Sequence, residues 1–195
     1  MKSKSIAAAS LVALAGFAAV GGAADKSPKS PATRPGKPGI TYKLGGGSEG
    51  WPADKRERVV KAMDEALALY NANGTFDKQL TASYSAGTPT ADGNYNGNIR
   101  FGGQIGLRVA LHEIGHCLGI GQHPKWQGLI KDGLWTGPNA LKQLREFDGP
   151  KAVLHADKQH FWPYGLNQDR EGSPEAFVRH VKMVAAFQRD LGITK

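Results

Sequence analysis

The stretch VALHEIGHCLGIGQH, residues 109–123, decides how this chain folds. In and around it, apolar side chains recur at spacings of four, three and four, at Leu107, Leu111, Ile114 and Leu118. This spacing predicts an amphipathic helix with one face packed on a core, and Gly119 predicts where that helix ends. At about 100° per residue, His112 and His116 project roughly 150° away from the apolar stripe. One face therefore anchors the helix, while the other presents two imidazoles.

Two histidines four apart on one helical face can bind a single metal ion. A catalytic zinc ion takes three protein ligands in a tetrahedron and keeps the fourth corner for water. Glu113, beside His112 and His116, is placed to accept a proton from that water and pass it to a leaving amine. The pattern predicts a zinc hydrolase with Glu113 as general base, and it leaves the third ligand open.

Three residues that follow the helix in the sequence are candidates for the third zinc ligand. His123 would serve if Gly121 lets the chain turn back shortly after the helix. His160 would serve if the loop DKQHFWPYG folds beneath the metal, and Glu146 would serve in the manner of zinc peptidases that use a downstream glutamate. We expect Gln122 to be no ligand, because an amide is a weak donor for zinc.

The chain divides into three parts. Residues 1–24 have two lysines, a short apolar run and then small residues, which predicts a secretory signal peptide. Residues 25–39 hold four prolines and four basic residues, which predicts an extended linker. Residues 40–195 are expected to form one domain. The protein is therefore expected to be secreted, extracellular or periplasmic, with no membrane association after signal cleavage.

The net charge of +8 is concentrated at the N-terminus. Residues 40–195 hold 19 Lys and Arg residues against 16 Asp and Glu, a net charge of +3, so we expect no nucleic-acid partner. Cys117 is the only cysteine, which excludes an internal disulfide and a cysteine-based zinc site, and we expect it to be buried.

The remaining pattern predicts an α+β fold. Strands are expected at 40–44, 78–85 and 97–103, with a helix from Pro52 to the sequence NANG between the first two. We expect NIRFGG to be the edge strand that an extended peptide could join. The C-terminal half is expected to be mostly loops, with a short helix in PNALKQLREF and a final helix that begins at Ser173 and Pro174 and ends at Gly192.

The sequence HEIGHCLG resembles the metzincin group of zinc endopeptidases over roughly residues 40–123. The chain also resembles a set of secreted bacterial metallopeptidase-like proteins, some joined to ricin-type lectin modules, which share RFG, HEIGH, QHFWPYGLN and RHVKMV with it. In that set the residue that matches His160 is histidine, whereas the match of His123 is often another residue. The resemblance therefore favours His112, His116 and His160 as the zinc ligands, with His123 as the alternative.

The chain departs from the metzincin pattern below the metal. Metzincins place a methionine there in a tight turn, but Met183 falls in the helical run AFVRHVKMVAAF, where core packing is the better interpretation. The turn WPYG would form the floor instead, and Tyr164 in it could donate to an oxyanion.

From the residues and the resemblance together we expect a secreted, monomeric zinc endopeptidase of metzincin-like fold that acts on protein or peptide substrates. One alternative is a binding module whose metal is only structural, which four protein ligands would favour. Another is a zinc hydrolase that acts on a wall polymer or glycan.

Overall fold

The computed structural model describes residues 39–194, so the predicted signal peptide and nearly all of the predicted linker lie outside the described residues. The fold is α+β, as the sequence predicts. Its first half contains the elements β1 (Ile40–Leu44), α1 (Ala53–Asn73), β2 (Lys78–Tyr84), β3 (Ala91–Gly93), β4 (Asn98–Phe101) and α2 (Leu107–Cys117). Its second half contains β5 (Ile130–Lys131), β6 (Leu134–Trp135), α3 (Pro138–Asp148), β7 (His155–Ala156), β8 (Phe161–Trp162) and α4 (Pro174–Leu191).

The larger sheet has the strand order β1-β2-β4-β3. β1 and β4 both run parallel to β2, and β3 runs antiparallel to β4. β4 therefore lies inside the sheet, so the expectation that NIRFGG is the edge strand is wrong. The edge strand next to β4 is β3, a three-residue strand in the stretch AGTPTADGNYN, whose turn-forming residues hide it from pattern analysis.

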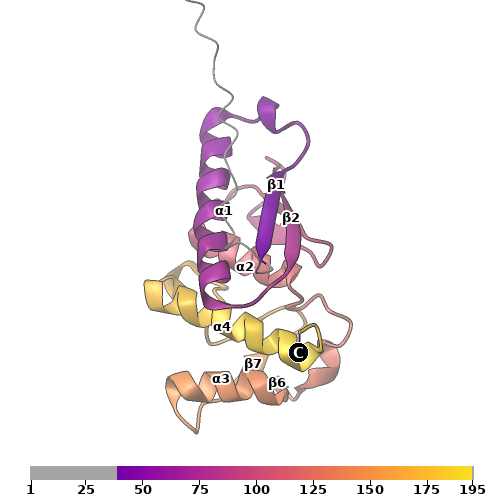
Figure 1. The fold of residues 1–195 in the computed structure, drawn as a ribbon, viewed down its shortest axis with the longest axis vertical. Coiled ribbons are helices and arrows are strands. Elements are labelled where there is room, and N and C mark those ends of the chain that lie inside the picture. Colours follow the sequence, from indigo (N-terminus) through magenta and orange to yellow (C-terminus); the bar gives the residue numbers. More distant parts are fainter. Residues whose placement is uncertain (1–38, 195) are drawn as a thin grey trace, which may run out of the picture.

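Helices α1 and α2 cover one face of this sheet, and α4 crosses the end of the layer that they form (Figure 1). The stripe predicted for α1 is fully buried at Val59, Met63, Leu67 and Tyr70. The stripe predicted for α2 is buried at Leu111, Ile114 and Leu118 and half-buried at Leu107. This burial fixes the rotation of α2, so its other face is directed away from the core.

The C-terminal half has more regular structure than the sequence predicts. A small antiparallel sheet, β5-β6-β7-β8, is built from two-residue strands, too short to leave a periodic signal. An aromatic cluster holds this half together, with ring centroids 4.6 to 5.2 Å apart, at Trp126, Trp135, Phe161 and Phe187. Asp190 of α4 accepts hydrogen bonds from the backbone N–H groups of Asn139 and Ala140 and so caps α3, which begins beside α4 in Figure 1.

The last helix matches its prediction closely. Ser173 accepts a hydrogen bond from the N–H of Ala176, Pro174 is the first helical residue, and Gly192 ends α4 with a φ of 74°. Met183 is fully buried within α4, so its interpretation as a core residue is confirmed. Within residues 39–194, none of the helices has the length and apolar character needed to cross a bilayer.

Candidate metal centre

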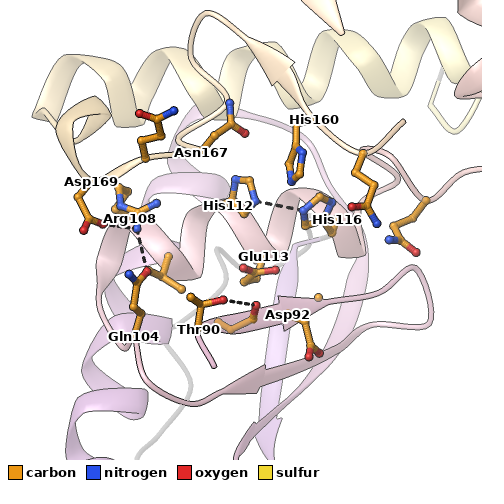
Figure 2. A pocket seen from close by; sticks show the side chains of 16 residues that line it. Thr90, Asp92, Gln104, Arg108, His112, Glu113, His116, His160, Asn167 and Asp169 are labelled. Atoms are coloured by element: carbon orange, nitrogen blue, oxygen red, sulfur yellow. Dashed lines mark hydrogen bonds and ion pairs between the residues drawn. The ribbon is translucent and has the colours of Figure 1, made fainter. Parts of the chain in front are cut away.

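Three histidines from two distant segments converge at one end of α2. Their ring nitrogens lie within 4.8 Å of one another, so His112, His116 and His160 are close enough to bind one metal ion. In Figure 2, His112 and His116 rise from the helix, and His160 reaches toward them from the loop above. His160 directly precedes β8, and β8 pairs with β7. The small sheet therefore carries the loop that contains His160 back over α2.

The hydrogen bonds of the two helical histidines fix which nitrogen faces the centre. Nδ1 of His112 lies 2.8 Å from the carbonyl oxygen of Gly165, and Nδ1 of His116 lies 2.8 Å from that of Ile120. Because a carbonyl oxygen can only accept, both Nδ1 atoms carry the proton. The two Nε2 atoms then face each other as lone pairs only 3.1 Å apart. Two lone pairs this close repel each other unless a cation lies beside them, so the arrangement fits a metal ion.

Burial keeps the two helical histidines in the neutral form that a metal needs. Desolvation, with a smaller effect of the nearby His116, lowers the pKa of His112 to about 3. Desolvation also lowers the pKa of His116. An imidazole is neutral above its pKa, and only the neutral form binds a metal ion. Near neutral pH these two side chains can therefore bind an ion without first releasing a proton.

His160 is more exposed than its two partners and is held from behind by Asp157. The Asp157 carboxylate accepts the backbone N–H groups of Gln159 and His160, at 2.8 and 2.6 Å, and lies 3.6 Å from Nδ1 of His160. A carboxylate behind the Nδ1 of a metal-binding histidine favours presentation of Nε2 to the ion.

The other two candidates for the third ligand lie elsewhere. His123 packs edge-on against Tyr95, with ring centroids 5.4 Å apart, and its Nδ1 accepts the N–H of Lys125. Glu146 is on the exposed face of α3 and accepts from Gln143. Among residues 39–194, the cluster of potential metal ligands around α2 contains His160 and neither of these two.

Glu113 lies directly below the histidines and is itself buried, with 7% of its surface exposed. Burial, reinforced by the negative charge of Asp92, raises the pKa of its carboxyl to about 7, although the N–H of Gly93 stabilises the ionised form. A metal ion in the adjacent site would lower this pKa. A carboxylate with a pKa near neutrality is suited to accept and release a proton.

The histidines and Glu113 open onto a cavity of about 580 Å³. Its lower wall is the edge strand, because Thr90, Ala91, Asp92 and Gly93 line it. At Gly93 the strand lies directly on α2, since a Cβ there would be 2.3 Å from the carbonyl oxygen of Glu113. This close approach holds the edge strand beside the three imidazoles.

Arg108 was not singled out by sequence reasoning, yet it lines the same cavity one helical turn before His112. Its guanidinium donates to the carbonyl of Leu166 at 2.6 Å. It also donates to Asp169 at 2.5 Å (Figure 2). It therefore ties α2 to the loop that supplies the Gly165 carbonyl. The i, i+4, i+8 spacing of Arg108, His112 and His116 was the signal that could have revealed it.

Tyr164 lies away from the histidine cluster. Its hydroxyl donates to Asp148 at 2.6 Å and receives a bond from Arg179, so it is directed to the surface beside α3 and α4. The interpretation of Tyr164 as an oxyanion donor is therefore not supported by its geometry. Cys117 is buried, as expected, and burial raises the pKa of its thiol to about 12.

His180 of α4 is hydrogen-bonded to the segment that supplies the Gly165 carbonyl. Its Nδ1 bonds to the carbonyl of Tyr164 at 2.8 Å, and its Nε2 lies 3.1 Å from both the carbonyl of Leu111 and the hydroxyl of Tyr70. His180 thus joins the residue before His112 to the residue before Gly165. Burial lowers the pKa of His180 to about 4.

This buried histidine makes the stability of the metal-free protein depend on pH. The unfolded chain binds a proton at His180 below about pH 6.5, whereas the folded chain does so only below about 4. Stability is therefore full above pH 6.5 and is lost as the pH falls. Between pH 7.5 and 5 we expect wild type to lose about 2 kcal/mol more unfolding free energy than His180→Gln, measured by urea denaturation with chelator present. Equal losses in the two proteins would contradict this role.

Gly121 determines how closely the His160 loop approaches α2. Its φ is 66°, and a Cβ there would be 2.3 Å from the carbonyl oxygen of Gln159. We expect Gly121→Ala to lower the unfolding free energy by about 2 kcal/mol or more and to weaken metal binding, because His160 is displaced. Gly128→Ala is the matched control, since a Cβ at Gly128 meets no atom within 4 Å. Denaturation and metal titration of both variants check this expectation, and similar behaviour of the two would contradict it.

Comparison of the chain with family models, with curated proteins and with solved structures found no match to any of them.

Proposed function

We propose that the protein is a secreted zinc endopeptidase. The observation that carries the proposal is the convergence of His112, His116 and His160 above the buried Glu113, in a cavity one wall of which is β3, an edge strand of the larger sheet among residues 39–194. Zinc suits this ligand set because imidazole nitrogen is among its preferred donors and three histidines form a recognised catalytic set.

Each part of the cavity then has a task in peptide hydrolysis. A bound zinc ion would supply the Lewis acidity that activates a water and polarises the scissile carbonyl. Glu113 takes a proton from the attacking water and delivers it to the leaving amine. The edge of β3 binds an extended substrate through backbone hydrogen bonds, which hold the scissile bond across the three histidines.

The number of histidines supports an enzyme over a binding module with a structural metal. A structural zinc site is usually closed by four protein ligands. Among the described residues, the histidine cluster has three members, and His123, which could have closed the site, contacts Tyr95 instead. A fourth position directed into a cavity of about 580 Å³ is what turnover requires.

The proposal is tested by incubating the zinc-loaded chain with a mixture of denatured proteins and detecting new peptide termini by mass spectrometry. We expect cleavage that a chelator abolishes and added zinc restores. Tight binding of one zinc per chain without cleavage of any protein would contradict the proposal and favour the binding module or a non-peptide substrate.

A further inference from the structure

A second cavity, of about 430 Å³, opens beside the metal-site cavity. The two cavities share His160, Asn167 and Gln168 as lining residues. Since His160 belongs to the metal cluster, a side chain that enters the second cavity would belong to a substrate residue close to the bond at the metal. The second cavity is therefore placed to select that substrate residue.

Trp162 is the apolar wall of the second cavity. The side chain is 42% exposed, and its ring stacks on His155 with 5.6 Å between centroids and 6° between planes. The ring is thus braced in place while much of it stays accessible. An indole ring in this position attracts both an aliphatic stem and a cation at its end.

Two carboxylates, Asp157 and Glu171, line the same cavity. Backbone groups anchor both, because Asp157 Oδ1 accepts from Gln159 and His160 and Glu171 Oε2 accepts the N–H of Asn167 at 3.0 Å. Within residues 39–194, neither carboxylate forms an ion pair with a lysine or arginine. Their negative charge is therefore positioned but not neutralised by a basic side chain.

Arg170 also lines the cavity, but it is exposed and makes no ion pair within the described part of the chain. An acidic substrate side chain would gain this one mobile cation and meet two fixed carboxylates. A neutral aromatic side chain would find one apolar wall and polar groups elsewhere. A long basic side chain matches both the indole ring and the carboxylates.

We propose that this second cavity is a specificity pocket that binds a lysine or arginine side chain of the substrate next to the scissile bond. The stem packs on Trp162, and the cationic group lies between the carboxylates of Asp157 and Glu171. This inference rests on the proposed peptidase function, whose failure the experiments below separate from its own.

The first experiment compares two peptide series that are identical except for lysine or its uncharged analogue norleucine at each position around the cut. At one position we expect kcat/KM to favour lysine by about tenfold, the effect of one charge-assisted contact. Glu171→Gln should remove most of this preference, by slowing cleavage of the lysine peptide much more than that of the norleucine peptide. Trp162→Ala should slow both peptides, because the stem loses its wall.

The matched control is Glu146→Gln, which removes an exposed carboxylate on α3 that lies outside the cavity. We expect it to keep the lysine preference of the wild type. Equal rates for lysine and norleucine at every position, a preference for glutamate, or an unchanged preference in Glu171→Gln would each overturn the inference while the peptidase function stands.

The second experiment needs no turnover. Nα-acetyl-lysine amide and Nα-acetyl-norleucine amide are titrated into the zinc-loaded protein while the indole N–H signal of Trp162 is followed by NMR, assigned from its loss in Trp162→Phe. We expect the signal to shift with the lysine amide and much less with the norleucine amide, and we expect Glu171→Gln to reduce the lysine shift to about that of norleucine. If the protein cleaves no peptide yet binds the lysine amide in this way, the second cavity binds basic side chains as proposed and the peptidase function is wrong. Equal shifts with the two amides would overturn the proposed preference of the second cavity for a basic side chain.

Discussion

Replacing Glu113 by glutamine is expected to lower kcat/KM for peptide cleavage by about 10² to 10⁴-fold while the zinc content stays at one ion per chain. Glutamine has the shape of glutamate but cannot accept a proton from the attacking water. Because Glu113 is not one of the three residues of the histidine cluster, we expect the variant to retain the metal. Steady-state kinetics on a cleaved peptide, with metal analysis of the same sample, measures both quantities.

The control for this variant is Asp92→Asn, which removes the acidic side chain that the edge strand β3 contributes to the cavity. Asp92 pairs with Arg100 at 2.7 Å, so we expect this variant to keep most of the activity. Full activity in Glu113→Gln would show that another group is the base.

Glu113→Gln should also raise the stability of the metal-free protein at alkaline pH. Burial raises the pKa of the Glu113 carboxyl to about 7, so above that pH the folded metal-free protein holds a buried negative charge. We therefore expect metal-free Glu113→Gln to be more stable than wild type at pH 8 and to lose this advantage as the pH falls toward the unfolded-state pKa. A residue that destabilises the fold is expected where function requires it.

The second large effect concerns the third ligand. His160→Ala is expected to weaken zinc binding by more than about 100-fold, because one of three protein ligands is lost. His123→Ala is the matched control, since His123 follows the same helix but packs against Tyr95. Zinc affinity of both variants is measured by competition with a chelator of known affinity. Strong loss in His123→Ala with little loss in His160→Ala would contradict the assignment.

Local patterns predicted the helix that carries the site. The apolar stripe of α2 fixed the direction of His112 and His116, and the Ser173, Pro174 and Gly192 signals located α4 within one residue. These features depend on neighbours within a few residues, so one sequence is enough to reveal them. The same holds for α1, whose four predicted core positions are all buried.

Features that depend on distant contacts were less predictable. Two-residue strands carry no periodicity, so the sheet that returns His160 to α2 was missed, and three ligand candidates stayed open. The edge position of β3 depends on its pairing with β4 rather than on its own residues. The support from the Gly165 and Ile120 carbonyls is backbone chemistry, which no side-chain pattern encodes.

The most direct test of the central claim is the structure of the zinc centre itself, determined by anomalous diffraction at the zinc edge from crystals of the metal-loaded protein. The account predicts one ion held by His112, His116 and His160, with about 2.0 to 2.1 Å from zinc to each nitrogen, and a solvent ligand in the fourth position. An ion bound by a fourth protein side chain, or one located away from these histidines, would contradict it.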